Sequence, residues 1–299
     1  MTGWTDWRPL PGWSPEPDVL AETLVGGQAF RWTHDDAAGI WSGVWSDHAA
    51  RLRLRAGRLD WSAPVALEPR VADALPRYLG LDAGWAARSD ALPWRSDAHL
   101  ARCLAEFRGL HLLRQPFGET LLAFLCSATK RIVQIRAMLA LLAERHGAPV
   151  AGAPDGLRRL PTWDELAAVP ERDLRACLLG FRARHIHATA RFLAAQPGWL
   201  EETEAAPYPE ARARLLGLPG VGGKVADCVL LFGAGRSEAF PVDTWILQAL
   251  ARHYGLDGWK PEQVARFGRA HFGPDAGFAQ QFLFAWERRN ATEARGPAA

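Results

Sequence analysis

The sequence predicts an α+β protein in which an N-terminal antiparallel β-sheet domain precedes an all-α domain. The first third contains short segments of alternating apolar and polar residues, whereas the remainder is a long series of helical patterns. With 299 residues, 48% hydrophobic and 23% charged, the chain has the composition of a soluble protein with room for two ordinary domains. We place these domains at residues 1–118 and 119–299.

The β-rich region is clearest between residues 28 and 62. Four apolar residues alternate there with arginine, aspartate or glycine: Leu52, Leu54, Leu59 and Trp61. The turn signals "HDDAAG", "SDHA" and "AG" separate the apolar runs. This pattern predicts an antiparallel meander with one face exposed to solvent.

Helical periodicity begins near Asp97 and continues almost to the C-terminus. The segment 118–147, for example, repeats apolar residues every three or four positions and ends in glycine. Short joints rich in proline and glycine separate the helical segments. The second domain is therefore expected to consist of helices alone.

Several protein classes are excluded by composition. No segment has the uninterrupted apolar length of a membrane span, and the N-terminus does not read as a signal peptide, so we expect a cytoplasmic protein. The four cysteines lie far apart in sequence and form no zinc or iron–sulfur ligand pattern. A net charge of +2 neither requires nor excludes a nucleic-acid partner.

The segment "LPGVGGK" lies between two helical patterns and predicts a helix–hairpin–helix. Gly220 and Gly222 can adopt positive φ angles and allow another backbone to approach closely. Backbone N–H groups at the start of the second helix are then available to an anion such as a DNA phosphate. A simple corner between two helices is the alternative explanation of this segment.

Lys224 follows the hairpin directly and is one of three lysines beside 32 arginines. A cation in the first turn of a helix is disfavoured by the helix dipole, so this position favours the neutral, nucleophilic amine. Cys228 lies four residues later on the same helical face. Asp243 occupies a predicted N-cap, where it either caps the helix or places a carboxylate near developing positive charge.

These residues resemble a known family. "LPGVGGKVADC" followed by "PVDTW" is similar to the helix–hairpin–helix (HhH-GPD) DNA glycosylases, and more narrowly to the 8-oxoguanine DNA glycosylase/AP lyases. The resemblance covers most of the chain, including "GGQAFRW", "LLGFRARHI" and "DAGFAQQFLF". It implies a twisted, TBP-like N-terminal sheet followed by a helix–hairpin–helix glycosylase domain.

The resemblance assigns roles in catalysis and base recognition. Lys224 matches the lysine that attacks C1′ of the damaged nucleotide, and Asp243 matches the aspartate that stabilises the oxocarbenium-like charge. Gly27 matches the glycine whose carbonyl accepts the N7–H of 8-oxoguanine. Cys228 and Phe284 match the pair that sandwiches the flipped base, and Gln280 matches the reader of its Watson–Crick edge.

Further matches concern the DNA itself. Phe181 matches the wedge that fills the gap in the duplex, and Arg182 matches the arginine that contacts the cytosine left behind. Gly220 and Gly222 match the phosphate-binding hairpin. The carbonyls that can hold a monovalent cation in the family match three positions of this chain: Leu216, Leu218 and Val221.

The chain departs from the family at several of these places. The family's animal members carry an asparagine run where this chain has Ala128, Thr129, Lys130 and Arg131, so one of the last three is expected to take over the contact with the vacated space. Trp245 stands where a phosphate-binding histidine is usual, and Gln134 replaces an arginine that reads the opposite base. Discrimination for cytosine opposite the lesion is therefore expected to be looser.

The resemblance implies a bifunctional enzyme that excises 8-oxoguanine and cleaves the strand by β-elimination through a lysine Schiff base. No cofactor or catalytic metal is implied. The expected partner is double-stranded DNA containing an oxidised purine, bound by a monomer at the bacterial nucleoid rather than at a membrane. The alternatives are a monofunctional alkylpurine glycosylase of the same superfamily, against which Lys224 argues, and a non-catalytic DNA-binding module.

Overall fold

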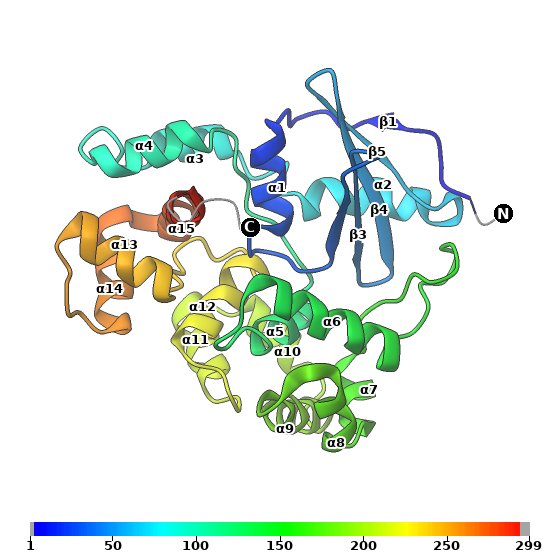
Figure 1. Cartoon of the computed structure of the whole chain (residues 1–299). Helices are drawn as coiled ribbons and strands as arrows, with labels where there is room; N and C mark the ends of the chain where they lie inside the picture. Colours follow the sequence, from blue (N-terminus) through cyan, green and yellow to red (C-terminus); the bar gives the residue numbers. More distant parts are fainter. Residues whose placement is uncertain (1–2, 294–299) are drawn as a thin grey trace.

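The computed structural model describes the backbone of residues 3–293 and the side chains of residues 3–290. Figure 1 shows the sheet at the right of the molecule and most of the helices to its left and below it. The predicted α+β class, with a sheet before a helical region, is confirmed.

The sheet contains five antiparallel strands in the order β1-β5-β4-β3-β2. Their bounds are β1 (Arg8–Pro9), β2 (Trp32–Asp35), β3 (Ile40–Trp45), β4 (His48–Arg55) and β5 (Arg58–Ser62). In the β4–β5 hairpin, Leu52 lies opposite Trp61 and Leu54 lies opposite Leu59. The predicted meander is confirmed, and the four alternating apolar residues share one face.

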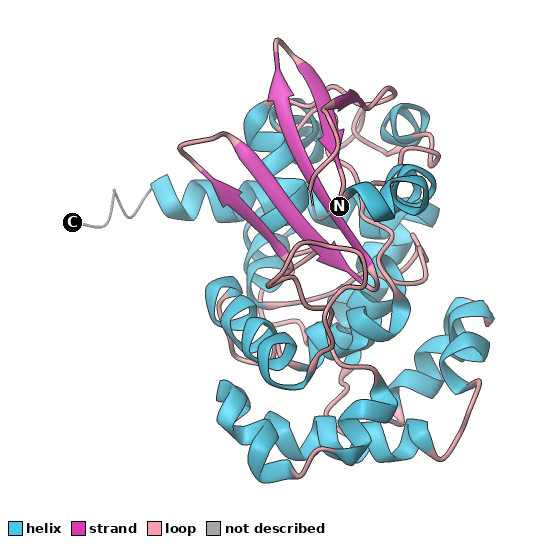
Figure 2. Ribbon diagram, turned by 90° about the vertical axis from the view of Figure 1, so that its right-hand side faces the viewer, coloured by secondary structure: helices cyan, strands magenta, loops and turns pink. Residues whose placement is uncertain are grey.

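Helices α1 (Pro17–Val25) and α2 (Glu68–Tyr78) pack on the sheet, and sequence periodicity did not predict them. Leu24 of α1 and Leu75 of α2 are fully buried in one core with Leu52 and Leu59 of the sheet. Figure 2 shows the strands near the surface with helices behind them. Removing these leucines from water stabilises the small β domain by about 1.5–3 kcal/mol each.

The rest of the described chain is helical, as predicted, and forms a second core. Its main helices are α5 (Phe117–Leu125), α6 (Ile132–His146), α7 (Trp163–Ala168), α8 (Glu171–Leu174), α9 (Arg182–Ala194), α10 (Trp199–Ala205), α11 (Tyr208–Leu216), α12 (Gly223–Phe232), α13 (Thr244–Tyr254), α14 (Pro261–Phe272) and α15 (Ala276–Glu293). None of the helices in the described region has the length and apolar character that crossing a membrane requires.

Two earlier helices also join this second core. They are α3 (Trp85–Ala91) and α4 (Ala98–Glu106), and α4 packs against α15. Leu100 and Cys103 of α4 are fully buried in the helical core. The chain thus crosses to the helical side before residue 118 and returns to the sheet core at Leu113. The domain boundary after residue 118 stays a prediction.

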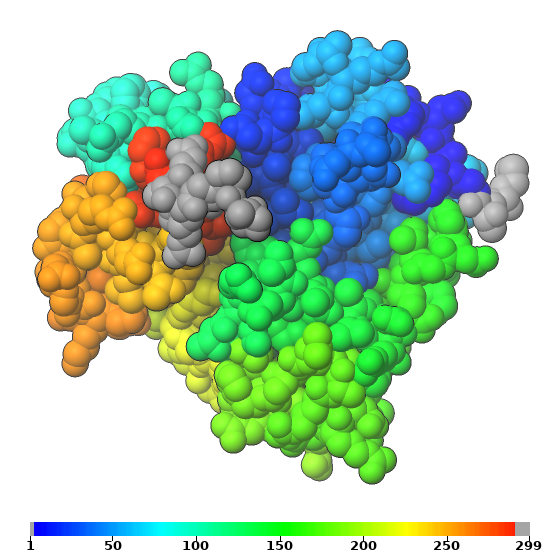
Figure 3. Space-filling model, in the orientation of Figure 1, coloured from blue at the N-terminus to red at the C-terminus, as the bar shows by residue number. Residues whose placement is uncertain are grey.

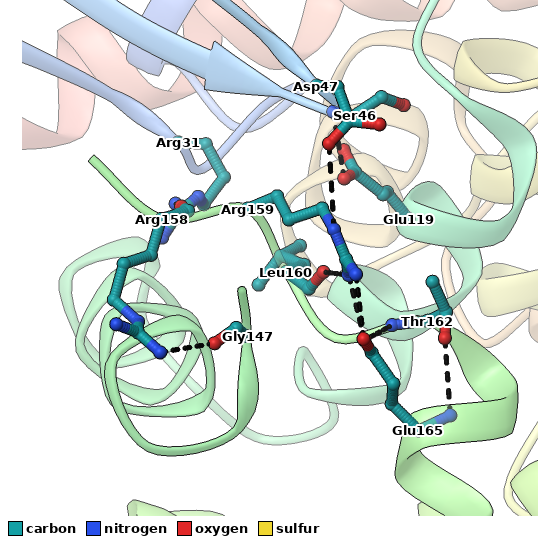
Figure 4. Close-up of polar contacts among 10 residues, drawn as sticks. All are labelled: Arg31, Ser46, Asp47, Glu119, Gly147, Arg158, Arg159, Leu160, Thr162 and Glu165. Atoms are coloured by element: carbon teal, nitrogen blue, oxygen red, sulfur yellow. Dashed lines mark hydrogen bonds and ion pairs between the residues drawn. The ribbon is translucent and has the colours of Figure 1, made fainter. Parts of the chain in front are cut away.

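Polar contacts connect the sheet to the helical region (Figure 4). Glu119, in the first turn of α5, accepts a hydrogen bond of 2.9 Å from the backbone N–H of Ser46 in the β3–β4 turn. Arg159 forms a 2.7 Å ion pair with Glu165 and lies 3.6 Å from Asp47. Burial raises the pKa of Glu119 to about 7, against the opposing effect of the Ser46 hydrogen bond.

Candidate active site and nucleic-acid interface

The predicted helix–hairpin–helix is formed by α11 and α12, and Lys224 is the second residue of α12. Apolar side chains such as Val225 and Val229 bury the inner face of α12. No side chain caps the N-terminus of this helix, whose N-cap position is Gly222. Its first backbone N–H groups are therefore available to an external acceptor.

The two hairpin glycines have different conformations. Gly220 has a φ of +80°, and a Cβ there would lie 2.6 Å from Nδ1 of His185. Both the backbone conformation and the close approach of His185 require glycine at this position. Gly222 is extended, with a φ of −101°, so a positive φ is wrong for this residue. A Cβ at Gly222 would meet nothing within 4 Å.

The amine of Lys224 is held in place by the end of α5. Its Nζ donates a hydrogen bond of 2.9 Å to Oγ of Ser127 and lies 5.0 Å from the ring centroid of Phe124. The Ser127 hydroxyl in turn donates to the carbonyl of Phe124 over 2.7 Å. Sequence reasoning gave Ser127 no role, because its only signal is a serine following an apolar helix.

Asp243 caps α13, as its position predicted. One carboxylate oxygen, Oδ1, accepts a 3.0 Å hydrogen bond from the backbone N–H of Ile246. Burial raises the pKa of Asp243, and this effect is opposed by the Ile246 hydrogen bond and by the positive charge of Lys224. Capping occupies one oxygen, so it does not exclude a second role facing Lys224.

The catalytic candidates and the base-recognition candidates surround one cavity of about 40 Å³. Its lining consists of Gly27, Phe124, Lys224, Cys228, Phe232, Pro241, Asp243, Gln280, Gln281 and Phe284. The ring of Phe284 lies so close to Gly27 that a Cβ at Gly27 would be 3.3 Å from Cε1 of Phe284. A cavity of this volume is too small to hold a purine.

Gly27 is fixed by contacts on both sides. The Gln28 side chain donates a hydrogen bond of 2.8 Å to the carbonyl of His111 and accepts one of 3.0 Å from the N–H of Leu113. Arg288 donates a hydrogen bond of 2.5 Å to the carbonyl of Gly26 and another of 2.8 Å to the carboxylate of Glu22. With a φ of +124°, Gly27 itself adopts a conformation that favours glycine.

The remaining base-recognition candidates are buried. Burial raises the pKa of Cys228 to about 12, although the Lys224 charge lowers it, so this side chain is a neutral thiol. Gln280 is buried, and its Oε1 accepts a 2.7 Å hydrogen bond from Nε2 of Gln281. Sequence reasoning missed Gln281, whose only signal is its place beside Gln280.

A second group of candidates lies where α9 begins. Phe181 is 47% exposed, whereas Arg182 is only 3% exposed. Arg182 donates hydrogen bonds of 3.1 Å to Oγ1 of Thr129 and 3.1 Å to the carbonyl of Leu179. It also donates a hydrogen bond to the carbonyl of Ala128. The structure therefore brings together Arg182 and Thr129, two expected contacts of the base left behind.

The other departures from the family pattern have local partners. Gln134 accepts a 3.0 Å hydrogen bond from the N–H of Arg131 and so helps to begin α6. The N–H of Lys130 donates 3.2 Å to the carbonyl of Ser127. Trp245 is half-buried. In the hairpin, the carbonyl of Leu218 accepts a hydrogen bond of 3.2 Å from the N–H of Val221. Binding of a monovalent cation by the hairpin carbonyls stays a prediction.

Comparison with known proteins gives the chain its family. Residues 122–272 match the family model of the HhH-GPD superfamily base excision DNA repair protein. The chain is 33% identical to the N-glycosylase/DNA lyase OGG1 of Arabidopsis thaliana, over 95% of this chain and 80% of the relative. It is 29% identical to the N-glycosylase/DNA lyase of Saccharomyces cerevisiae, over 81% of this chain and 69% of the relative.

A solved structure is similar over nearly the whole length. The 8-oxoguanine glycosylase/lyase of Clostridium acetobutylicum, in complex with double-stranded DNA containing cytosine opposite 8-oxoG, superposes with a TM-score of 0.85. The two sequences are 26% identical, and the match covers 98% of this chain and 100% of the other. The chain therefore belongs to the HhH-GPD superfamily of base excision DNA repair proteins, in its group of 8-oxoguanine glycosylase/lyases.

Proposed function

We propose that this chain is a bifunctional DNA glycosylase that excises 8-oxoguanine from duplex DNA and then cleaves the strand, in base excision repair. One observation supports this above the others. Lys224, Asp243 and the four expected base contacts line a single cavity, and that cavity adjoins a helix start with no side-chain cap.

The chemistry assigned to Lys224 begins with the neutral amine. Its Nζ forms a bond to C1′ as the bond from C1′ to the base breaks, and the base leaves with the proton lost by Nζ. Asp243 stabilises the positive charge that develops at C1′. The opened sugar forms a Schiff base, loses a C2′ proton and expels the 3′ phosphate, after which water releases the lysine.

The recognition of the lesion is assigned to Gly27. Its carbonyl is an acceptor, and 8-oxoguanine carries an N7–H that guanine lacks, so a fixed acceptor favours the lesion. The contacts of Gln28 and Arg288 fix this part of the backbone, which supports a role as a rigid reader. Entry of the base would require Phe284 to move away from Gly27, because the cavity is too small for a purine.

Binding is assigned to duplex DNA whose damaged base is flipped out of the stack. The hairpin of Gly220 and Gly222 would hold a phosphate, while Phe181 and Arg182 would occupy the gap. Thr129, Lys130 and Arg131 would face the opposite strand. We further propose a monomer acting in the cytoplasm at the nucleoid, with domains at residues 1–118 and 119–299.

Borohydride trapping tests the proposal against its alternatives. Incubation with a duplex containing 8-oxoguanine opposite each of the four bases should give a covalent adduct that disappears in Lys224→Gln. On a parallel duplex containing an alkylated purine, release of the free base without an adduct would support the monofunctional alkylpurine glycosylase. Binding without base release from any oxidised duplex would support a non-catalytic module.

A further inference from the structure

Leu178 is an exposed leucine in a backbone conformation that favours glycine. It lies in η2 (Arg175–Leu179), the irregular turn between α8 and α9, with a φ of +62° and a ψ of 14°. Its side chain is 61% exposed. A leucine in the left-handed region costs conformational energy that glycine avoids, and this one gains little packing in return.

The turn around Leu178 is firmly held. Its neighbours Cys177 and Leu179 are fully buried. Arg175 donates a hydrogen bond of 3.3 Å to the carbonyl of Gly180, and Arg182 donates one of 3.1 Å to the carbonyl of Leu179. The surroundings therefore fix the strained residue and present its side chain to solvent.

Other exposed apolar side chains lie on elements that meet at this turn. Val133, at the start of α6, is 64% exposed, and α6 packs against η2. Phe181, the predicted wedge, follows three residues after Leu178. We call Val133, Leu178 and Phe181 the wedge face; they are three of the six large hydrophobic residues exposed within the described chain.

The surroundings of the wedge face carry positive charge. Lys130 and Arg131 precede α6, and Arg184 follows Phe181 in the first turn of α9. In Figure 3 the green surface of residues near 130 lies against the yellow-green surface of residues near 180. Apolar tips flanked by cations fit a duplex whose bases are apolar and whose phosphates are anionic.

We propose that Leu178 is a second wedge residue, which enters the base stack beside the base left behind while Phe181 fills the gap of the extruded lesion. This inference rests on the proposed function. Base extrusion removes stacking on both strands, and an apolar side chain inserted on each side restores contact area. Leu178 would also restrain the remaining base near Arg182, whose guanidinium lies under the same turn.

The test uses Leu178→Gly, because glycine fits the φ of +62° without strain. The matched control is Ala56→Gly, at an exposed β-hairpin residue with a φ of +50° far from the hairpin of α11 and α12 in sequence. Single-turnover excision of 8-oxoguanine opposite cytosine should fall about tenfold in Leu178→Gly, with an unchanged or higher Tm. Ala56→Gly should change neither excision nor DNA binding.

A binding readout separates this inference from the proposed function. In a Lys224→Gln background, a duplex can carry an abasic analogue at the lesion site and 2-aminopurine as the base opposite it. The 2-aminopurine fluorescence should brighten on binding, and Leu178→Gly should remove most of that signal. The excision defect should shrink on a duplex lacking the opposite base. Leu178→Met, which keeps an apolar side chain, should retain more activity than Leu178→Asn, which fits the backbone but is polar.

Two results would overturn the proposal. One is wild-type excision and wild-type fluorescence in Leu178→Gly; the other is a loss of activity that follows a fall in Tm. If the wild-type enzyme excised nothing from any oxidised duplex, the proposed function would fail instead, while the fluorescence signal would still report on Leu178.

Discussion

The helices that carry the two catalytic candidates begin in opposite ways. Helix α12 begins behind Gly222 without any side-chain cap, whereas α13 begins with the Asp243 carboxylate bonded to its own backbone. We call the first helix start open, because Gly222 is exposed, and the second closed, because the Asp243 carboxylate accepts a hydrogen bond from the backbone N–H of Ile246. The same N-terminal dipole is thus available to an outside anion at α12 and is used internally at α13.

This difference explains how two adjacent helix starts serve different purposes. An open start suits a DNA phosphate, which brings its own negative charge. Under the proposed function, a start already filled by a carboxylate places a negative charge next to Lys224, where positive charge would develop at the sugar. Substitutions at each start should therefore separate binding from chemistry.

The largest expected effect is at the nucleophile. Lys224→Gln should abolish the borohydride adduct and lower single-turnover excision by more than about 10³-fold, since nucleophile deletions in other enzymes cost at least this much. Lys224→Arg is the matched control, because it keeps a cation but cannot form a Schiff base. Equal trapping in Lys224→Arg and wild type would remove Lys224 from the mechanism.

The next largest effect on excision is expected at Asp243, at the closed start of α13. Asp243→Asn should lower excision by about 10²–10³-fold through loss of the negative charge, while Asn still caps α13. Because burial raises the pKa of Asp243 and disfavours its charged form, the Tm of Asp243→Asn should equal or exceed that of wild type at pH 8. Asp243→Ala should in addition lose about 1 kcal/mol of stability from the missing cap.

Substitution at Gly222, at the open start of α12, should change DNA binding rather than chemistry. Gly222→Asp gives α12 a side-chain cap at a position with room for a Cβ, so stability should rise by a few tenths of a kcal/mol. Its negative charge should also weaken binding of undamaged duplex about tenfold, or ~1.4 kcal/mol. Gly222→Ser supplies a neutral cap for comparison. Undiminished affinity in Gly222→Asp would show that this start does not hold a phosphate.

A third helix start extends the comparison to a residue that is expected to affect stability alone. Glu119 in the first turn of α5 neither caps its helix with its side chain nor lies at the cavity of Lys224, but bonds to Ser46 of the sheet. Its pKa rises from 4.5 to about 7 on folding. The contribution of Glu119 to folding stability is therefore fully present below pH 4.5 and is lost as the pH rises through 7. Glu119→Gln should remove that pH dependence and stabilise the protein by about 1–3 kcal/mol at pH 8. Thermal unfolding from pH 5 to pH 8 measures it; parallel curves for both proteins would contradict the assignment.

The fold followed largely from periodicity, and the failures have physical causes. Leu52, Leu54, Leu59 and Trp61 alternate because one face of the sheet is buried, so the meander was visible in the sequence. Helices α1 and α2 were missed because they lie within the region that sequence periodicity identified as β-rich. The path of α4 to α15 depends on tertiary packing that no local pattern contains.

The site was predicted by resemblance where a motif exists and missed where only geometry decides. The position of Lys224 in the first turn of α12 and the cap at Asp243 follow from local sequence. The contact of Ser127 with Lys224 joins residues 97 positions apart, and no local signal announces it. A positive φ at Gly222 was wrong because glycine permits that conformation without requiring it.

The small volume of the cavity beside Phe284 has a consequence for turnover. If the open form is the minor one, any ligand that needs it binds more weakly by the fraction of enzyme that is open. A base still attached to DNA can offset this penalty through the phosphate contacts of its strand. Under the proposed function, the excised base has no such tether, so the return of Phe284 to its position against Gly27 should favour departure of the base and keep product inhibition low.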